Sequence, residues 1–118
     1  MSPQDLITGI KIGVVDQNDS IYRDLFSSTE VSSATDPYWK RALSFFESLD
    51  SEQKAIFFEI IRQVSVDTVS NTFGVLDGVI CVEGVDADLR LLDRSGAKQN
   101  GDLQTLFLVD EEKGAELV

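Results

Sequence analysis

The chain of 118 residues has no histidine and a single cysteine, Cys81. Without histidine, the commonest general base and the commonest metal ligand are both missing, and neither a Ser-His-Asp triad nor a Cys-His pair is possible. One cysteine also excludes an intrachain disulfide and a zinc site of the cysteine and histidine type. Cys81 lies between Ile80 and Val82. It is therefore predicted to be a small buried apolar residue in a protein of a reducing compartment.

Basic residues are scarce, since 10 Lys and Arg stand against 21 Asp and Glu, which gives a formal net charge of −11. A surface of this sign repels nucleic-acid phosphates and anionic lipid headgroups, so direct binding to nucleic acid or to a membrane is disfavoured. Two interpretations stay open. The acids attract a basic protein partner, or they only keep the protein soluble.

Long apolar runs are missing too, because none approaches the length of about 20 residues that a membrane-spanning helix needs. Residues 1–5 lack the basic start of a signal peptide, and we expect a cytoplasmic protein. An apolar content of 42% suffices for one core, so residues 1–118 are expected to form a single domain that needs no metal or cofactor to fold. The acidic tail, about 110–118, is expected to fray.

The N-terminal segment carries a helix-start signal in Ser2 followed by Pro3. Apolar residues at helical spacing extend this helix to about Val15. The polar residues 16–19 then predict a turn, followed by a second short helix that ends near Phe26.

Helix-capping residues mark the start of two further helices. A Ser- and Thr-rich connector over residues 27–35 precedes Asp36 and Pro37, which repeat the cap-and-proline signature. Asp50 with Gln53 three residues later resembles a capping box and opens the next helix.

This next helix, about 51–76, is apolar around most of its circumference, which is typical of a helix that is buried on most sides. We therefore expect it at the centre of the fold, with the other helices packed around it. Four of its residues are predicted to be almost fully buried: Phe57, Phe58, Ile61 and Val64.

Short apolar runs separated by turn signals follow this helix. The runs cover residues 79–82 and 89–92, and Gly-containing turns punctuate the segment. They predict a small antiparallel sheet between about 79 and 100. Asp102 is then expected to cap a short C-terminal helix. The predicted fold class is α+β, mostly α.

No complete catalytic, cofactor or metal motif is found. Asp16, Asn18 and Ser20 have the spacing of a calcium loop, but the required glycine and terminal glutamate are replaced by Ile21 and Ser27, so a polar turn is the better interpretation.

Glu59 and Asp67 form a possible carboxylate pair on the helix at 51–76. They are better interpreted as part of a solvent-facing strip in which Glu59 pairs with Arg62. The sequence therefore predicts no catalytic, cofactor-binding or metal-binding residue.

Two groups of residues are candidates for binding a partner. The first is the acidic set in the expected sheet, Glu83, Asp86 and Asp88. The second is the aromatic pair Tyr38 and Trp39, because aromatic residues beside basic ones are frequent at interfaces. Trp39 also fits a role in closing the core.

Two turn motifs lie in the C-terminal third: Val-Leu-Asp-Gly at residues 75–78, and Asn-Gly-Asp-Leu at residues 100–103, which leads into the segment ending at Leu108. These motifs resemble those of a family of small bacterial proteins of uncharacterised function, similar to immunity proteins. The resemblance implies a long helix ending at the first motif and a closing helix after the second. It implies no catalytic residue.

Together these observations favour a non-enzymatic protein-binding module, an immunity-like or accessory bacterial protein that binds a basic partner. Two alternatives stay open, a hydrolase-type enzyme that uses carboxylates and a divalent metal, and a homo-oligomeric structural protein. Convergent carboxylates in a deep pocket would favour the enzyme, and a large exposed apolar patch would favour the oligomer.

Overall fold

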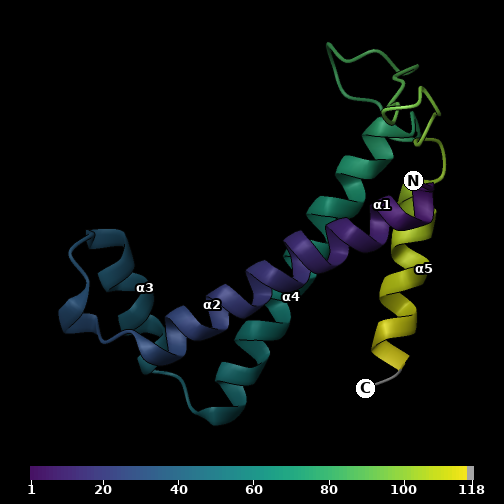
Figure 1. Ribbon diagram of the computed structural model, residues 1–118. Helices are drawn as coiled ribbons and strands as arrows, with labels where there is room; N and C mark the ends of the chain where they lie inside the picture. The colour runs from purple at the N-terminus through teal and green to yellow at the C-terminus, as the bar shows by residue number, and fades with distance from the viewer. Residues whose placement is uncertain (117–118) are drawn as a thin grey trace.

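A computed structural model describes residues 1–116, and these residues form an all-helical fold (Figure 1). Its elements are the helices α1 (Pro3–Ile10), α2 (Gln17–Ser28), α3 (Pro37–Glu47), α4 (Ser51–Leu76) and α5 (Leu103–Glu116), together with the π-helical segment η1 (Lys11–Asp16) and the 3-10 segment η2 (Val31–Ser33). None of the helices in this part of the chain has the length and apolarity to cross a membrane.

The first helix begins where the sequence predicts but continues past its predicted end near Val15. The Ser2 hydroxyl accepts the N–H of Asp5, and the Asp5 carboxylate accepts the N–H of Ser2. Two hydrogen bonds with Ser2 lower the pKa of Asp5. The bond with the Ser2 backbone has the larger effect, and the bond with the Ser2 hydroxyl adds to it. The turn expected over residues 16–19 is wrong, because α1, η1 and α2 form one continuous rod. Two residues of this segment, Asp16 and Asp19, lie 3.0 and 4.0 Å from the Arg62 guanidinium of α4, a long-range contact that sequence spacing does not reveal.

Helix α4 has the bounds that its sequence predicts. Asp50 and Gln53 form the reciprocal capping box, and the helix ends at Leu76 with Asp77 as its C-cap. Gly78 follows with a φ of 78°, a conformation that favours glycine. A helix of 26 residues is about 39 Å long. Asp36 likewise caps α3 by accepting the N–H of Tyr38, with Pro37 in the first turn.

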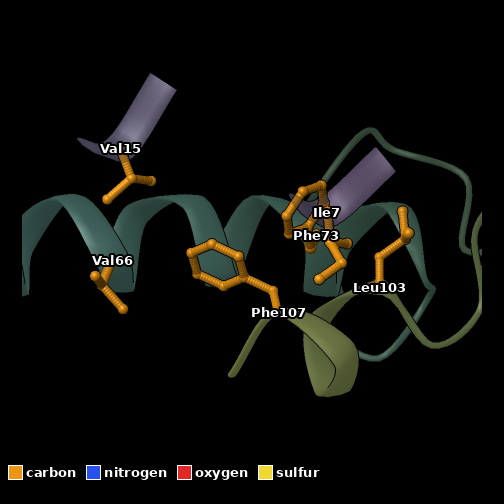
Figure 2. Packing of buried hydrophobic residues seen from close by; sticks show 6 residues of the cluster. All are labelled: Ile7, Val15, Val66, Phe73, Leu103 and Phe107. Carbon is orange, nitrogen blue, oxygen red and sulfur yellow. The ribbon is translucent and has the colours of Figure 1, made fainter. Parts of the chain in front are cut away.

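Two separate hydrophobic clusters lie along α4. The first joins the N-terminal rod, α4 and α5, and in Figure 2 Phe107 of α5 reaches across α4 between Val66 and Phe73. Ile7, Val15 and Leu103 complete this cluster. The second cluster joins α2, α3 and the first half of α4, and consists of Phe26, Leu43, Phe46 and Phe58.

The burial predicted for α4 is correct only in part. Phe58 is buried at 7% exposure, while Phe57 and Ile61 are half-buried. Val64 is exposed at 59%, so its predicted burial is wrong. The N-terminal rod and α5 pack against other residues of α4, among them Val66 and Phe73, and leave Val64 open to solvent.

The small sheet predicted between residues 79 and 100 is wrong, since the only strand-like pairing in the described residues is one antiparallel bridge between Leu92 and Lys98. Side chains take the place of a second strand here. The Asn100 amide donates to the Leu76 and Leu89 carbonyls and accepts the N–H of Leu91. Cys81 is exposed in this segment, which contradicts its predicted burial.

The acidic C-terminal segment is helical to Glu116 in the part that the structure describes, and residues 117–118 lie outside it. The fraying expected for residues 110–118 stays a prediction. Lys11 of η1 contacts the Asp110 carboxylate at 3.6 Å and the Glu111 carboxylate at 3.8 Å. These ion pairs hold the second half of α5 against the N-terminal rod.

Arg62 of α4 connects three elements. Its Nε and Nη2 donate to the two Glu111 oxygens at 3.1 and 3.0 Å, and its Nη1 lies 3.0 Å from the Asp16 carboxylate. The predicted pairing with Glu59 is therefore replaced by longer-range contacts. Partial burial acts to lower the pKa of Arg62, but the hydrogen bonds to Glu111 and Asp16 outweigh it and raise the pKa.

The molecule is elongated and open. Its principal extents are 51 × 36 × 25 Å and its radius of gyration is 17.7 Å, whereas a compact domain of this length has a radius of about 13–14 Å. Its accessible surface of 7981 Å² likewise exceeds the roughly 6,300 Å² of a compact monomer of this mass. A large part of the surface is therefore available for contact with other molecules.

Candidate functional site

The most distinctive local feature is the segment between α4 and α5, residues 77–102, which we call the connecting loop. Both of its ends are fixed at the C-terminal end of α4. The Asp77 carboxylate accepts the N–H of Gly101 at 2.6 Å and that of Gln104 at 2.8 Å. Asp77 thus caps both the exit of α4 and the entry of α5. The Asp102 side chain, which the sequence predicted for this role, makes no such bond in residues 1–116.

Close packing adds to this anchoring. The N–H groups of Val79 and Ile80 both bond to the carbonyl of Gly74. The Ile80 side chain lies over Gly74 so closely that a Cβ at position 74 would meet it within 3 Å. Gly74 therefore forms a notch in α4 that receives the first residues of the connecting loop.

A second turn within the loop is organised by Asp93. Its carboxylate accepts the hydroxyl and the N–H of Ser95 and the N–H of Ala97. These bonds lower the pKa of Asp93, and the bond from the Ser95 hydroxyl has the largest effect. The loop is irregular in shape but is tied together by its own side chains.

The three acidic candidates lie on this loop, and all are exposed. The Asp86 carboxylate accepts the N–H of Asp88, and the Asp88 carboxylate lies 3.7 Å from Arg90 in a pair that is mostly open to solvent. Glu83 forms no ion pair within the described residues. The acids are therefore presented on a structured turn, as expected, although this turn does not belong to a sheet.

Apolar side chains are exposed on the same loop. Val79 is 66% exposed and Leu92 is 53% exposed, and Val82, Val85 and Leu91 are exposed as well. Loops of more than about 12–15 residues without regular structure are uncommon, and they are usually either functional or flexible linkers. An anchored loop that presents apolar and acidic side chains together has the composition of a contact surface.

The aromatic candidates lie elsewhere. Tyr38 and Trp39 are on α3, at the opposite end of the molecule from the connecting loop (Figure 1). Trp39 is half-buried with its ring centroid 6.0 Å from that of Phe26, so it packs against the second cluster. Tyr38 is exposed and contacts Trp39 edge-on. The structure therefore does not unite the five candidates in one site.

Groups that would carry enzymatic chemistry do not converge in the described residues. Asp16, Asn18 and Ser20 lie on a continuous helix, which cannot wrap around a calcium ion. Glu59 and Asp67 line an open cleft of about 370 Å³, where the Gln63 amide donates to Asp67. No three His, Cys, Asp or Glu side chains in residues 1–116 are placed to hold a metal ion.

Sequence reasoning missed the anchoring residues Asp77 and Asn100. Both belong to the turn motifs, Leu-Asp-Gly and Asn-Gly, at the two ends of the loop. The available signal was that each motif pairs a hydrogen-bonding side chain with a glycine. In comparisons with known proteins, no family model, no curated protein and no solved structure matches this chain.

Proposed function

We propose that the chain is a non-enzymatic protein-binding module that contacts its partner through the connecting loop. One observation supports this most directly: the loop is fixed at both ends by Asp77, Asn100 and the Gly74 notch, yet it exposes five apolar side chains. Apolar side chains gathered on an ordered surface favour a contact with another protein. Fixed ends also reduce the entropy lost when the loop is covered.

The charge of the loop and of the whole chain favours a basic partner. Glu83, Asp86 and Asp88 are exposed on the same loop as the apolar residues, and interfaces commonly combine apolar contacts with polar ones at their rim. The formal charge of −11 would attract a basic protein from a distance and speed its encounter. The motifs at residues 75–78 and 100–103 favour one version of this function, an immunity-like role in a bacterial cytoplasm. In this role the acidic loop covers the basic surface of another protein.

The test uses the intact chain as bait in a bacterial lysate at low salt, followed by rate measurements on the purified captured protein. Replacing the three loop acids together, as Glu83→Gln, Asp86→Asn and Asp88→Asn, should slow association and flatten its dependence on salt.

A matched control removes three exposed acids from the other end of the molecule and gives the same change in net charge: Asp24→Asn, Glu30→Gln and Glu47→Gln. The control should bind like the natural chain, with a much smaller change in rate. If both triple variants associate alike, or if the captured proteins are not basic, the acidic surface serves solubility alone and the proposal fails.

A further inference from the structure

We infer that Asn100 and Gly101 form a self-modification site, which the anchored connecting loop holds unreactive and which reacts when the loop opens. Asparagine is among the chemically labile residues, and a following glycine has no side chain to hinder attack by its backbone nitrogen. Asn100 is the only one of the three asparagines that precedes a glycine, since Asn18 and Asn71 precede an aspartate and a threonine. The inference concerns the chemistry of the loop anchor and does not depend on the proposed function.

The reaction is an attack on the side-chain amide by the next backbone nitrogen. The Gly101 nitrogen loses its proton and bonds to the Cγ of Asn100. The bond from Cγ to Nδ2 breaks, and Nδ2 takes up a proton and leaves as ammonia, so that a cyclic imide remains. Water then adds to either carbonyl of this ring and opens it, which gives aspartate or isoaspartate at position 100. Water is the only co-reactant that the reaction needs.

The nitrogen that would attack is held by Asp77. The Gly101 N–H donates to the Asp77 carboxylate at 2.6 Å. Removing this proton would leave a negative nitrogen directly beside a negative carboxylate, and the repulsion between like charges opposes this. Asp77 also accepts the N–H of Gln104, so its carboxylate cannot turn away without breaking the cap of α5. The attacking atom is therefore kept protonated in the folded protein.

The amide that would be attacked is fixed as well. Asn100 is 8% exposed, and its Nδ2 donates to the carbonyls of Leu76 and Leu89. Its Oδ1 accepts the N–H of Leu91 at 2.8 Å. Ring closure requires the side chain to turn its amide carbon toward the Gly101 nitrogen, and the three bonds oppose this rotation. Only the molecules in which the loop has opened locally can react.

The product cannot form the anchor again. A carboxylate at position 100 has no N–H to donate, and it would place its negative charge against the carbonyl oxygens of Leu76 and Leu89. The new charge would also lie near the Asp77 carboxylate, which bonds to the next residue in the chain. Isoaspartate in addition lengthens the backbone just before α5. The reaction therefore releases the connecting loop from the end of α4 and does not reverse.

The test is a time course of the intact chain at mildly alkaline pH, in which peptide mass spectrometry follows the conversion of amide to acid at each asparagine. We expect Asn100 to react at least about 100-fold more slowly in buffer than in concentrated urea, because only the locally open fraction reacts in buffer. Asn18 and Asn71 are exposed on α2 and α4 and serve as internal controls that stay unmodified in buffer. Equal rates at Asn100 with and without urea would overturn the inference.

Two variants separate opening of the loop from unfolding of the whole chain. Asp77→Ala frees the Gly101 N–H and loosens the anchor, so it should speed the reaction of Asn100 in buffer at least about tenfold. Phe58→Ala is the control, since Phe58 belongs to the second hydrophobic cluster and makes no contact with the anchor. It should speed the reaction much less, although it lowers the overall stability more. The opposite order would mean that only complete unfolding exposes the site, which contradicts the inference.

Asn100→Asp reproduces one of the two products directly. Hydrogen exchange over residues 77–102 should rise in this variant, and far-ultraviolet circular dichroism verifies that the helices persist. Asn18→Asp makes the same chemical change at an exposed position of α2 and should leave the exchange of residues 77–102 as it is in the natural chain. The time courses do not depend on these variants. If residues 77–102 stay equally protected in Asn100→Asp, the product does not release the loop and the inference fails.

Discussion

At the scale of single residues, Asp77 performs two tasks that proteins usually divide between two side chains. It lies directly after the last residue of α4, and its carboxylate accepts the N–H of Gln104 in the first turn of α5 and the N–H of Gly101 just before that helix. A negative charge at a helix N-terminus is also favoured by the helix dipole. Asp77 therefore sets where one helix stops and where the next begins.

We expect Asp77→Ala to lower the free energy of unfolding by about 1–2 kcal/mol, the usual cost of losing a helix cap. Asp102→Ala should change it by much less, because the Asp102 side chain caps nothing in residues 1–116. Urea unfolding of both variants makes the comparison. Equal losses would mean that the acid nearest to α5 in sequence is the true cap.

Single residues also show that helix caps can be predicted from the sequence, whereas the burial of a helical residue cannot always be. The caps Ser2, Asp36 and Asp50 were predicted because each acts on N–H groups two or three residues away. The burial of Val64 was predicted wrongly. A helical pattern shows which residues share a side, but the pattern does not show whether another element covers that side.

At the scale of elements, Arg62 holds α4, α5 and the N-terminal rod together. Its two bonds to Glu111 are paired and parallel, and its contact with Asp16 reaches the end of η1. All three side chains are partly buried or half-exposed, so solvent screens these contacts only in part. The contact with Asp16 joins the rod to α4 at the place where the sequence predicted a turn.

Arg62→Met should lower the free energy of unfolding by about 2 kcal/mol, because it removes charged hydrogen bonds, leaves Asp16 without its partner and leaves Glu111 with Lys11 alone. Arg62→Lys should not restore it fully, since lysine cannot bond to both oxygens of Glu111 in the same way. Arg90→Met, which removes an exposed pair with Asp88, is the control and should change stability by less than about 0.5 kcal/mol. An equal effect of Arg62→Met and Arg90→Met would show that the three-element contact adds nothing.

The missing sheet is likewise an element-scale lesson. Residues 79–82 and 89–92 have the apolar runs of strands, and the turn residues between them were identified correctly. The backbone groups of Leu89 and Leu91 nevertheless bond to the amide of Asn100 instead of a neighbouring strand. A local pattern of apolar and turn residues does not predict such a long-range side-chain contact. The sequence therefore located the segment between the two helices but did not predict that it forms an irregular loop instead of a sheet.

At the scale of the whole molecule, two hydrophobic clusters share one long helix and have no buried residue in common. Helix α3 packs only into the second cluster, while α5 packs only into the first. The two ends of the molecule should therefore differ in how easily each opens.

Phe58→Ala tests this division. Phe58 lies 5.4 Å from the Phe46 ring and 5.6 Å from the Phe57 ring, so the substitution should lower the free energy of unfolding by about 3–5 kcal/mol. Hydrogen exchange should rise more in α3 than in α5. Phe107→Ala should give the reverse pattern, and a uniform rise in both variants would mean that the molecule opens as a single unit.

The anchoring of the connecting loop has a consequence for how this protein can change. Because the chain leaves and re-enters the helical scaffold at one place, residues 82–98 form an insertion that can be exchanged without moving α4 or α5. The entropy of closing a loop grows only slowly with its length, so longer replacements cost little stability. Under the proposed function, rewriting about one-seventh of the chain would change the recognised partner, while Asp77, Asn100 and Gly74 stay in place as the anchors.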